Sequence, residues 1–270
     1  MCIIINEHNI FIHIPKCAGS SIKRLINSNK LNKPKLKNLS NKIEKGHWGI
    51  YPLIKNNIFS PNMKGHIVLR DPIEWYVSLY FYVKKFKDHP YFIYAKNDFK
   101  YFFNHLINMK NNLIDIDEHL SNHVNNKLGK KGIFCEYKPY DKLKKDVIDL
   151  KYIDNHPDFN ILMSERNIDE GLYTYFVLFL ISKINPLLLF SKTKENVLNN
   201  LNDYIHTNIN IYSMTELDKL VTNLNFDFKN IHANKSSIKE SYISYYDDEM
   251  LEKIKNHHEI FYKIKEILIS

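Results

Sequence analysis

The chain has 270 residues, of which 44% are hydrophobic and 13% aromatic, with a formal net charge of +8. This length is enough for a large hydrophobic core, so we expect a single domain over residues 1–270. The excess of Lys and Arg indicates an anionic partner: a nucleic acid, an acidic membrane surface or a phosphorylated small molecule. Net charge alone does not distinguish these three partners. A lysine-rich surface that binds no partner is equally common.

The cysteine pattern and the apolar runs exclude several classes of protein. Cys2, Cys17 and Cys135 are odd in number and far apart, so neither a disulfide framework nor a Cys-x-x-Cys metal site is expected. A reducing compartment fits best. The N-terminus has no basic segment and its apolar run is interrupted, so it is a poor signal peptide. The run at 172–181 is too short to span a bilayer and predicts a buried helix.

Strand-like and helix-like patterns alternate along the chain, which predicts an α/β fold. The apolar runs Ile10–Ile14 and His66–Arg70 predict buried parallel strands, each leading into a helix. Phe159–Met163 is a candidate for a further strand. The Lys- and Asn-rich segment Asn27–Lys42 is expected to be a solvated surface loop, and residues 84–158 are expected to hold an insert.

Two further helices are expected in the second half of the chain. Asn167, with Glu170 three residues later, has the spacing of a capping box, so a helix should begin near Ile168. Apolar residues at helical spacing up to Leu268 predict one C-terminal helix, with Ser244 and Asp247 placed to cap it. His257 and His258 fall inside this helix, where adjacent side chains point to different faces, one to the surface and one to the core.

The stretch "FIHIPKCAGSSIKRLI" (11–26) passes from a strand to a helix that begins near Ser20. Such a turn aims backbone N–H groups and the helix dipole at one spot, which attracts an anion. Gly19 lets the backbone approach closely, the two serines add hydroxyl donors, and Lys16 adds a positive charge. From these residues alone, a phosphate cradle and an ordinary turn are equally supported, because no Walker A loop occurs in the chain. The candidate cradle consists of Lys16, Cys17, Ala18, Gly19, Ser20 and Ser21.

A second stretch, "VLRDPIEWYVSLYFYVKK" (68–85), places Arg70 at the end of a strand and Pro72 at the start of a helix. The guanidinium of Arg70 suits a second phosphate, and Ser78 can reach the same group. The alternative is a structural pairing of Arg70 with Asp71, with Ser78 facing solvent.

Together the two stretches resemble a known family. "HIPKCAGSS" is similar to the 5′-phosphosulfate loop of sulfotransferases that use 3′-phosphoadenosine 5′-phosphosulfate (PAPS), and "LRDPIEWYVSLY" to their 3′-phosphate motif. The resemblance is closest to bacterial and Golgi carbohydrate sulfotransferases. Weaker likenesses lie at "EKGHWGIYP" (44–52), "LMSERNIDEGLYTY" and "HANKSSIKESY" (232–242), whereas residues 84–158 show none. One departure is Trp75, where the family often has a second arginine.

The resemblance implies a P-loop nucleotide hydrolase-like three-layer sandwich with a central parallel sheet. It implies transfer of a sulfuryl group from PAPS to a hydroxyl of a glycan or glycolipid, leaving adenosine 3′,5′-bisphosphate. Lys16 would stabilise the bridging oxygen, and the N–H groups from Ala18 to Ser21 would hold the 5′-phosphate. Arg70 and Ser78 would hold the 3′-phosphate.

The acceptor hydroxyl needs a general base. His47 is the candidate, because imidazole titrates near neutrality and the resemblance places a histidine there, although a purely structural histidine is the alternative. Glu44 is the fallback base. Lys235 and Ser236 are expected to help bind the cofactor, and a lysine from residues 235–239 is expected to compensate for Trp75. His13 is expected to face the core or the cofactor edge.

No metal is expected, since the sequence has no clustered Cys/His set. The absence of an anchor helix favours a cytoplasmic bacterial enzyme acting on a surface polysaccharide precursor, with the acceptor site inside 84–158. A tyrosyl peptide acceptor stays open. The other hypotheses are a kinase of related fold and a basic nucleic-acid-binding protein, which is disfavoured because most aromatic residues sit in core-like patterns.

Overall fold

The computed structural model describes residues 2–28, 49–55, 57–60, 62–87, 89, 91–108, 167–224, 226 and 241–269. Its centre is an open sheet of four strands in the order β1-β2-β3-β4. The strands are β1 (Cys2–Ile4), β2 (Asn9–Ile12), β3 (Lys64–Leu69) and β4 (Ile209–Ser213).

The sheet is mixed, whereas the family resemblance implied a central parallel sheet. Strand β1 pairs with β2 antiparallel, in a register that sets Ile3 opposite Phe11. The few residues between these strands permit only an antiparallel return. Strands β2, β3 and β4 are parallel to one another. Their carboxyl ends therefore lie at one edge of the sheet, where ligands bind in open α/β folds.

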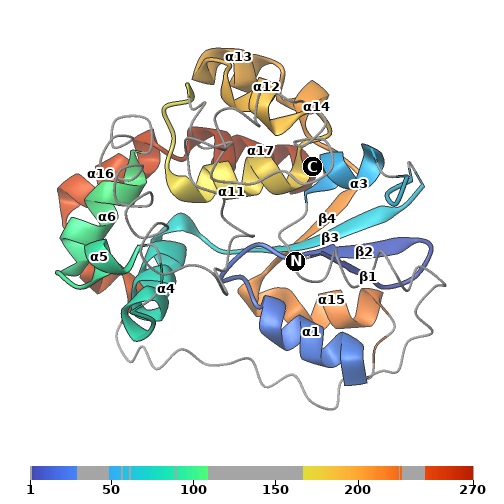
Figure 1. Ribbon diagram of the computed structural model, residues 1–270, viewed down its shortest axis with the longest axis horizontal. Helices are drawn as coiled ribbons and strands as arrows, with labels where there is room; N and C mark the ends of the chain where they lie inside the picture. The colour runs from blue at the N-terminus through green and yellow to red at the C-terminus, as the bar shows by residue number, and fades with distance from the viewer. Residues whose placement is uncertain are drawn as a thin grey trace.

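Helices cover both faces of the sheet (Figure 1). Helices α1 (Gly19–Ser28) and α15 (Leu217–Asn223) lie on one face, and α11 (Leu172–Ile181) and α17 (Glu259–Ile269) lie on the other. The predicted α/β class is therefore confirmed, and the layering is compatible with a sandwich. Further helices lie outside these layers or beside the sheet: α3 (Ile50–Lys55), α4 (Pro72–Lys85), α5 (Phe92–Ala95), α6 (Phe99–Ile107), α12 (Pro186–Phe190), α13 (Lys194–Asn199), α14 (Leu201–Tyr204) and α16 (Asp248–Asn256).

Helices α4 and α11 agree with the sequence prediction. Pro72 is the first residue of α4, and the Asp71 carboxylate caps the helix by accepting from the N–H of Ile73 (2.9 Å). Proline is tolerated there because the first N–H groups of a helix have no intrahelical partner. All ten residues of α11 are buried, as their continuous apolar character predicts. These two helices carry the largest fully buried side chains near the site, Trp75, Tyr76 and Tyr173.

The predicted capping box before α11 is wrong. The helix begins at Leu172, its N-cap is Gly171, and no side chain caps it. The carboxylate of Glu170 is instead fully buried, where it pairs with the ammonium of Lys194 (3.0 Å) and accepts from the N–H of Ile260 (3.3 Å). The amide of Asn167 donates to the carbonyl of Ser191. The carboxylate of Glu170 therefore forms an ion pair with Lys194 instead of the helix cap that the local pattern had predicted.

The predicted single C-terminal helix is also wrong, because the chain breaks between α16 and α17 at His257 and His258. The carbonyl of His257 accepts from the N–H of Gly171 (2.7 Å), and Nδ1 of His258 lies 2.7 Å from the Thr174 hydroxyl. His258 is in the core as predicted, whereas His257 is largely covered rather than on the surface. Asp247 caps α16 as predicted, but Ser244 lies in the 3₁₀ helix η2 (Tyr242–Tyr245) and caps nothing there.

Several predictions lie outside the described residues. These are the strand Phe159–Met163, residues 29–42 of the surface loop and residues 109–158 of the insert.

Candidate functional site

The turn between β2 and α1 has an unusual backbone. Lys16 and Ala18 have φ values of 65° and 56°, in the left-handed region that non-glycine residues seldom adopt. Within the described chain, the N–H groups of Ala18, Gly19 and Ser20 donate to no carbonyl, whereas that of Ser21 donates to Ala18 (2.9 Å). Three backbone donors therefore remain at the start of α1, where the helix dipole favours negative charge.

Gly19 is required at this turn by the packing of His13. A Cβ atom at position 19 would lie only 1.8 Å from Cδ2 of the His13 ring. Burial lowers the pKa of His13 to about 3, with a smaller contribution from the charge of Lys16, so its ring is neutral. His13 thus lies directly under the turn, and it adds no positive charge to it.

Lys16 brings a cation to the turn. Its ammonium lies 4.0 Å from the centroid of the Tyr82 ring on α4, a cation–π contact. The pKa of Lys16 is lowered to about 8, mainly by burial and then by the positive charges of Arg70 and Lys85. Among the described residues no carboxylate pairs with the Lys16 ammonium. The positive charge of Arg70 therefore acts on the Lys16 ammonium.

Arg70 follows the last residue of β3, and two nitrogens of its guanidinium lack a hydrogen-bond partner among the described residues. Atoms Nε and Nη1 are buried and make no hydrogen bond within the described structure. Asp71 does not pair with Arg70, because its carboxylate caps α4. Ser78 is only 8% exposed, so it does not face solvent. Both parts of the structural alternative for Arg70 and Ser78 are therefore contradicted. Buried donors without a hydrogen bond are costly, so the two nitrogens of Arg70 are candidates for binding an anion.

Sequence reasoning missed Tyr173, which touches both halves of the site. Its hydroxyl accepts from the N–H of Arg70 (3.0 Å) and donates to the carbonyl of Arg70 (3.1 Å). The same hydroxyl lies 3.7 Å from Sγ of Cys17 in the turn. Burial raises the pKa of the Cys17 thiol to about 11, so this thiol stays protonated. No sequence pattern could have identified Tyr173, since its partners are remote in the chain.

Trp75 has a role that differs from the one its position suggested. It was expected to mark a missing arginine of the 3′-phosphate site. Its indole is fully buried and stacked on the Tyr173 ring, with centroids 4.7 Å apart, and its N–H donates to the carbonyl of Pro15 (2.8 Å). Trp75 therefore fastens the turn of Lys16 to helix α4. A buried tryptophan usually finds such a partner for its N–H.

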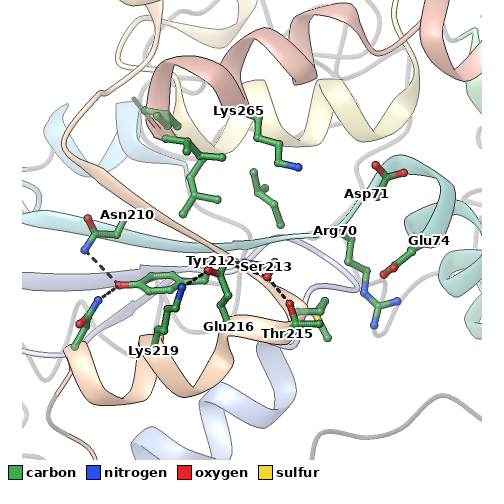
Figure 2. Close-up of a pocket in the computed structure, with 16 residues that line it drawn as sticks. Arg70, Asp71, Glu74, Asn210, Tyr212, Ser213, Thr215, Glu216, Lys219 and Lys265 are labelled. Atoms are coloured by element: carbon green, nitrogen blue, oxygen red, sulfur yellow. Dashed lines mark hydrogen bonds and ion pairs between the residues drawn. The ribbon is translucent and has the colours of Figure 1, made fainter.

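A pocket of about 600 Å³ opens beside Arg70, at the carboxyl ends of β3 and β4 (Figure 2). Figure 2 shows it between α15 and α17, with Lys265 projecting from α17. Its wall includes Tyr212, whose hydroxyl accepts from the amides of Asn210 (3.3 Å) and Asn223 (3.0 Å). Lys16 does not line this pocket, so Arg70 is the residue shared by the pocket and the cationic pair.

The other predicted site residues lie outside the described residues: His47, Glu44, Lys235 and Ser236. Within the described ranges, no three His, Cys, Asp or Glu side chains gather as a metal site. None of the helices described has the length and hydropathy to cross a bilayer.

Comparisons of the chain with models of protein families, with curated proteins and with solved structures give no match. Its function is therefore inferred from the residues of the site.

Proposed function

We propose that this chain is a PAPS-dependent sulfotransferase of P-loop-like fold that transfers a sulfuryl group to a carbohydrate hydroxyl and releases adenosine 3′,5′-bisphosphate. The observation behind the proposal is the pair of cations Lys16 and Arg70, which repel each other and are not neutralised by any described carboxylate. Two cations that form no ion pair with a described carboxylate suit a ligand with two anionic groups.

The 5′-phosphosulfate is assigned to the turn at the start of α1. Three free N–H groups, from Ala18 to Ser20, and the ammonium of Lys16 are the donors that support this assignment. The N–H of Ser21 is already used by Ala18, so its contribution is expected to come from its hydroxyl. The left-handed residues Lys16 and Ala18 keep these donors in place before any ligand arrives.

The 3′-phosphate is assigned to Arg70, whose buried Nε and Nη1 have no other partner among the described residues. The pocket of about 600 Å³ beside Arg70 is large enough for a nucleoside. Ser78, Lys235 and Ser236 are proposed as further contacts on the strength of the family resemblance.

When bound, PAPS supplies the sulfuryl group, and the protein supplies position and charge. Lys16 stabilises the negative charge that develops on the phosphate oxygen as its bond to sulfur breaks. The acceptor oxygen forms the new bond to sulfur and loses its proton to His47, or to Glu44 in its place. Residues 84–158 are proposed to shape a site for a glycan or glycolipid, such as a surface polysaccharide precursor in the bacterial cytoplasm.

Isothermal titration with adenosine 3′,5′-bisphosphate and with ATP tests this proposal. We expect micromolar binding of the bisphosphate, weaker binding of ATP, and loss of bisphosphate binding in Lys16→Ala. Lys263→Ala is the matched control, because Lys263 is an exposed lysine of α17 paired with Glu266. ATP binding as tight as that of the bisphosphate would favour a kinase, and binding of neither would overturn the assignment of a nucleotide site.

A further inference from the structure

The backbone of Arg70 lies between two regular elements and belongs to neither. Strand β3 ends at Leu69, which is its last residue paired with β4, and α4 begins at Pro72. The N–H and the carbonyl of Arg70 therefore lack sheet and helix partners. The Tyr173 hydroxyl satisfies both, accepting one hydrogen bond (3.0 Å) and donating the other (3.1 Å). One phenol thus holds both backbone groups of Arg70, which constrains the direction of its side chain.

The same phenol contacts the other half of the anion site. Its oxygen lies 3.7 Å from Sγ of Cys17, the residue after Lys16. Its ring stacks on Trp75, whose indole N–H holds the carbonyl of Pro15, the residue before Lys16. Tyr173 is itself carried by α11, a helix buried along its whole length. Tyr173 thus links both the turn at Lys16 and the end of β3 at Arg70 to the buried helix α11.

We propose that Tyr173 is a positioning residue that sets the spacing between Lys16 and Arg70, and so determines the preference for a ligand with both a 5′- and a 3′-phosphate. This inference rests on the proposed function. In this role Tyr173 does not need to touch the ligand. It acts on the ligand through the backbone of Arg70.

The physical basis is the geometry of a guanidinium bound to a phosphate. Paired N–H donors must meet the oxygens at defined distances and angles, so a small displacement of the strand end weakens the contact. Removal of the hydroxyl leaves two backbone groups of Arg70 without their partner and lets the strand end shift. The 5′-phosphate should be less affected, because the hydroxyl meets the turn only at Sγ of Cys17 (3.7 Å), a weaker contact than its two hydrogen bonds to Arg70.

The substitution Tyr173→Phe removes the hydroxyl and keeps the ring on Trp75. Affinities for adenosine 3′,5′-bisphosphate and for adenosine 5′-phosphate are measured for both proteins. We expect affinity for the bisphosphate to fall about tenfold and affinity for the 5′-phosphate to change by less than about twofold, because only the 3′-phosphate contact is disturbed. A general loss of structure would reduce both affinities alike and would overturn the positioning role.

Tyr175→Phe is the matched control. Tyr175 lies on the same helix, is equally buried, and donates its hydroxyl proton to the carbonyl of Ile168, so its loss tests the effect of removing a buried phenol hydrogen bond. We expect it to lower thermal stability about as much as Tyr173→Phe while it leaves the ratio of the two affinities unchanged. A changed ratio in Tyr175→Phe would contradict a specific role for Tyr173.

A double-mutant cycle with Arg70→Ala shows whether Tyr173 acts through Arg70. We expect Tyr173→Phe to have no further effect on bisphosphate affinity once Arg70 is alanine, and full additivity would overturn the inference. Wild-type protein that binds neither nucleotide would overturn the proposed function and the role of Tyr173 with it. Wild-type binding with an unchanged ratio in Tyr173→Phe would overturn only the role of Tyr173.

Discussion

The indole N–H of Trp75 donates to the carbonyl of Pro15 across 2.8 Å, which fastens helix α4 to the turn that carries Lys16. The family resemblance of the sequence led us to expect an arginine at position 75. Here the side chain is fully buried, so it holds the turn in place and cannot itself contact a solvated ligand.

Substitutions at Trp75 separate these two roles. Trp75→Phe keeps an aromatic ring over Tyr173 and loses the N–H donor, so the free energy of unfolding should fall by about 1 kcal/mol, with weaker bisphosphate binding. Trp75→Arg buries an unpaired charge and should lower the free energy of unfolding by more than about 3 kcal/mol. Urea denaturation measures both changes. A stable Trp75→Arg protein with tighter bisphosphate binding would show that the position still serves the ligand.

Nucleotide binding should weaken at alkaline pH because of Lys16. Burial and the nearby charge of Arg70 lower the pKa of Lys16 to about 8. The ammonium attracts phosphate only while it is protonated, so affinity should fall as pH rises through this value. Titration calorimetry over this range measures the effect. Lys16→Arg should remove the decline up to about pH 9, since a guanidinium stays charged, and a wild-type affinity independent of pH would contradict a role for Lys16.

Gly19 and His13 should behave as a coupled pair. Gly19→Ala places a Cβ atom 1.8 Å from the ring of His13, so either the ring or the start of α1 must move. We expect a loss of about 2 kcal/mol in the free energy of unfolding, together with weaker bisphosphate binding. His13→Ala removes the ring, so the double variant should recover part of the stability that Gly19→Ala loses. Chemical denaturation of the four proteins decides this, and strictly additive losses would contradict the contact.

The fold should be labile in weak acid. Burial lowers the pKa of His13 and His258 to about 3 and that of His66 to about 4. The unfolded chain then binds more protons than the folded chain between about pH 4 and 6.5, so stability rises with pH across this window. Glu170 acts oppositely, because burial raises its pKa from 4.5 to about 7 and stability falls as pH rises between those values. Three histidines outnumber one carboxyl, so unfolding at pH 5 should need less urea than at pH 7.

Two variants check the assignment of this pH dependence. Glu170→Gln removes the opposing contribution and should steepen the loss of stability on acidification. His66→Gln removes one of these three imidazoles and should make the loss shallower. Greater stability of the wild-type protein at pH 5 than at pH 7 would contradict the account.

Local patterns predicted those features that neighbouring residues determine. The Asp71–Pro72 pair marks the start of α4, and the ten apolar residues of 172–181 mark a buried helix. The apolar runs that precede Lys16 and Arg70 mark strands β2 and β3. The α/β class could thus be predicted from the sequence.

Contacts between residues that are far apart in the chain could not be predicted from the sequence. Tyr173 meets Arg70 across 103 positions of the chain, and no periodicity identifies a single phenol in an apolar helix. Glu170 has the spacing of a cap, but its carboxylate gains more from Lys194 and the N–H of Ile260. The break at His257 likewise depends on the N–H of Gly171, which local helical spacing does not reveal.

The most direct test of the central claim is the contribution of the 3′-phosphate to binding. Affinities for adenosine 3′,5′-bisphosphate and adenosine 5′-phosphate are compared in the wild-type protein and in Arg70→Ala. A shared anion site at Lys16 and Arg70 predicts that the wild-type protein prefers the bisphosphate by at least about tenfold and that Arg70→Ala abolishes the preference. Equal affinities in the wild-type protein, or a preference that survives in Arg70→Ala, would contradict it.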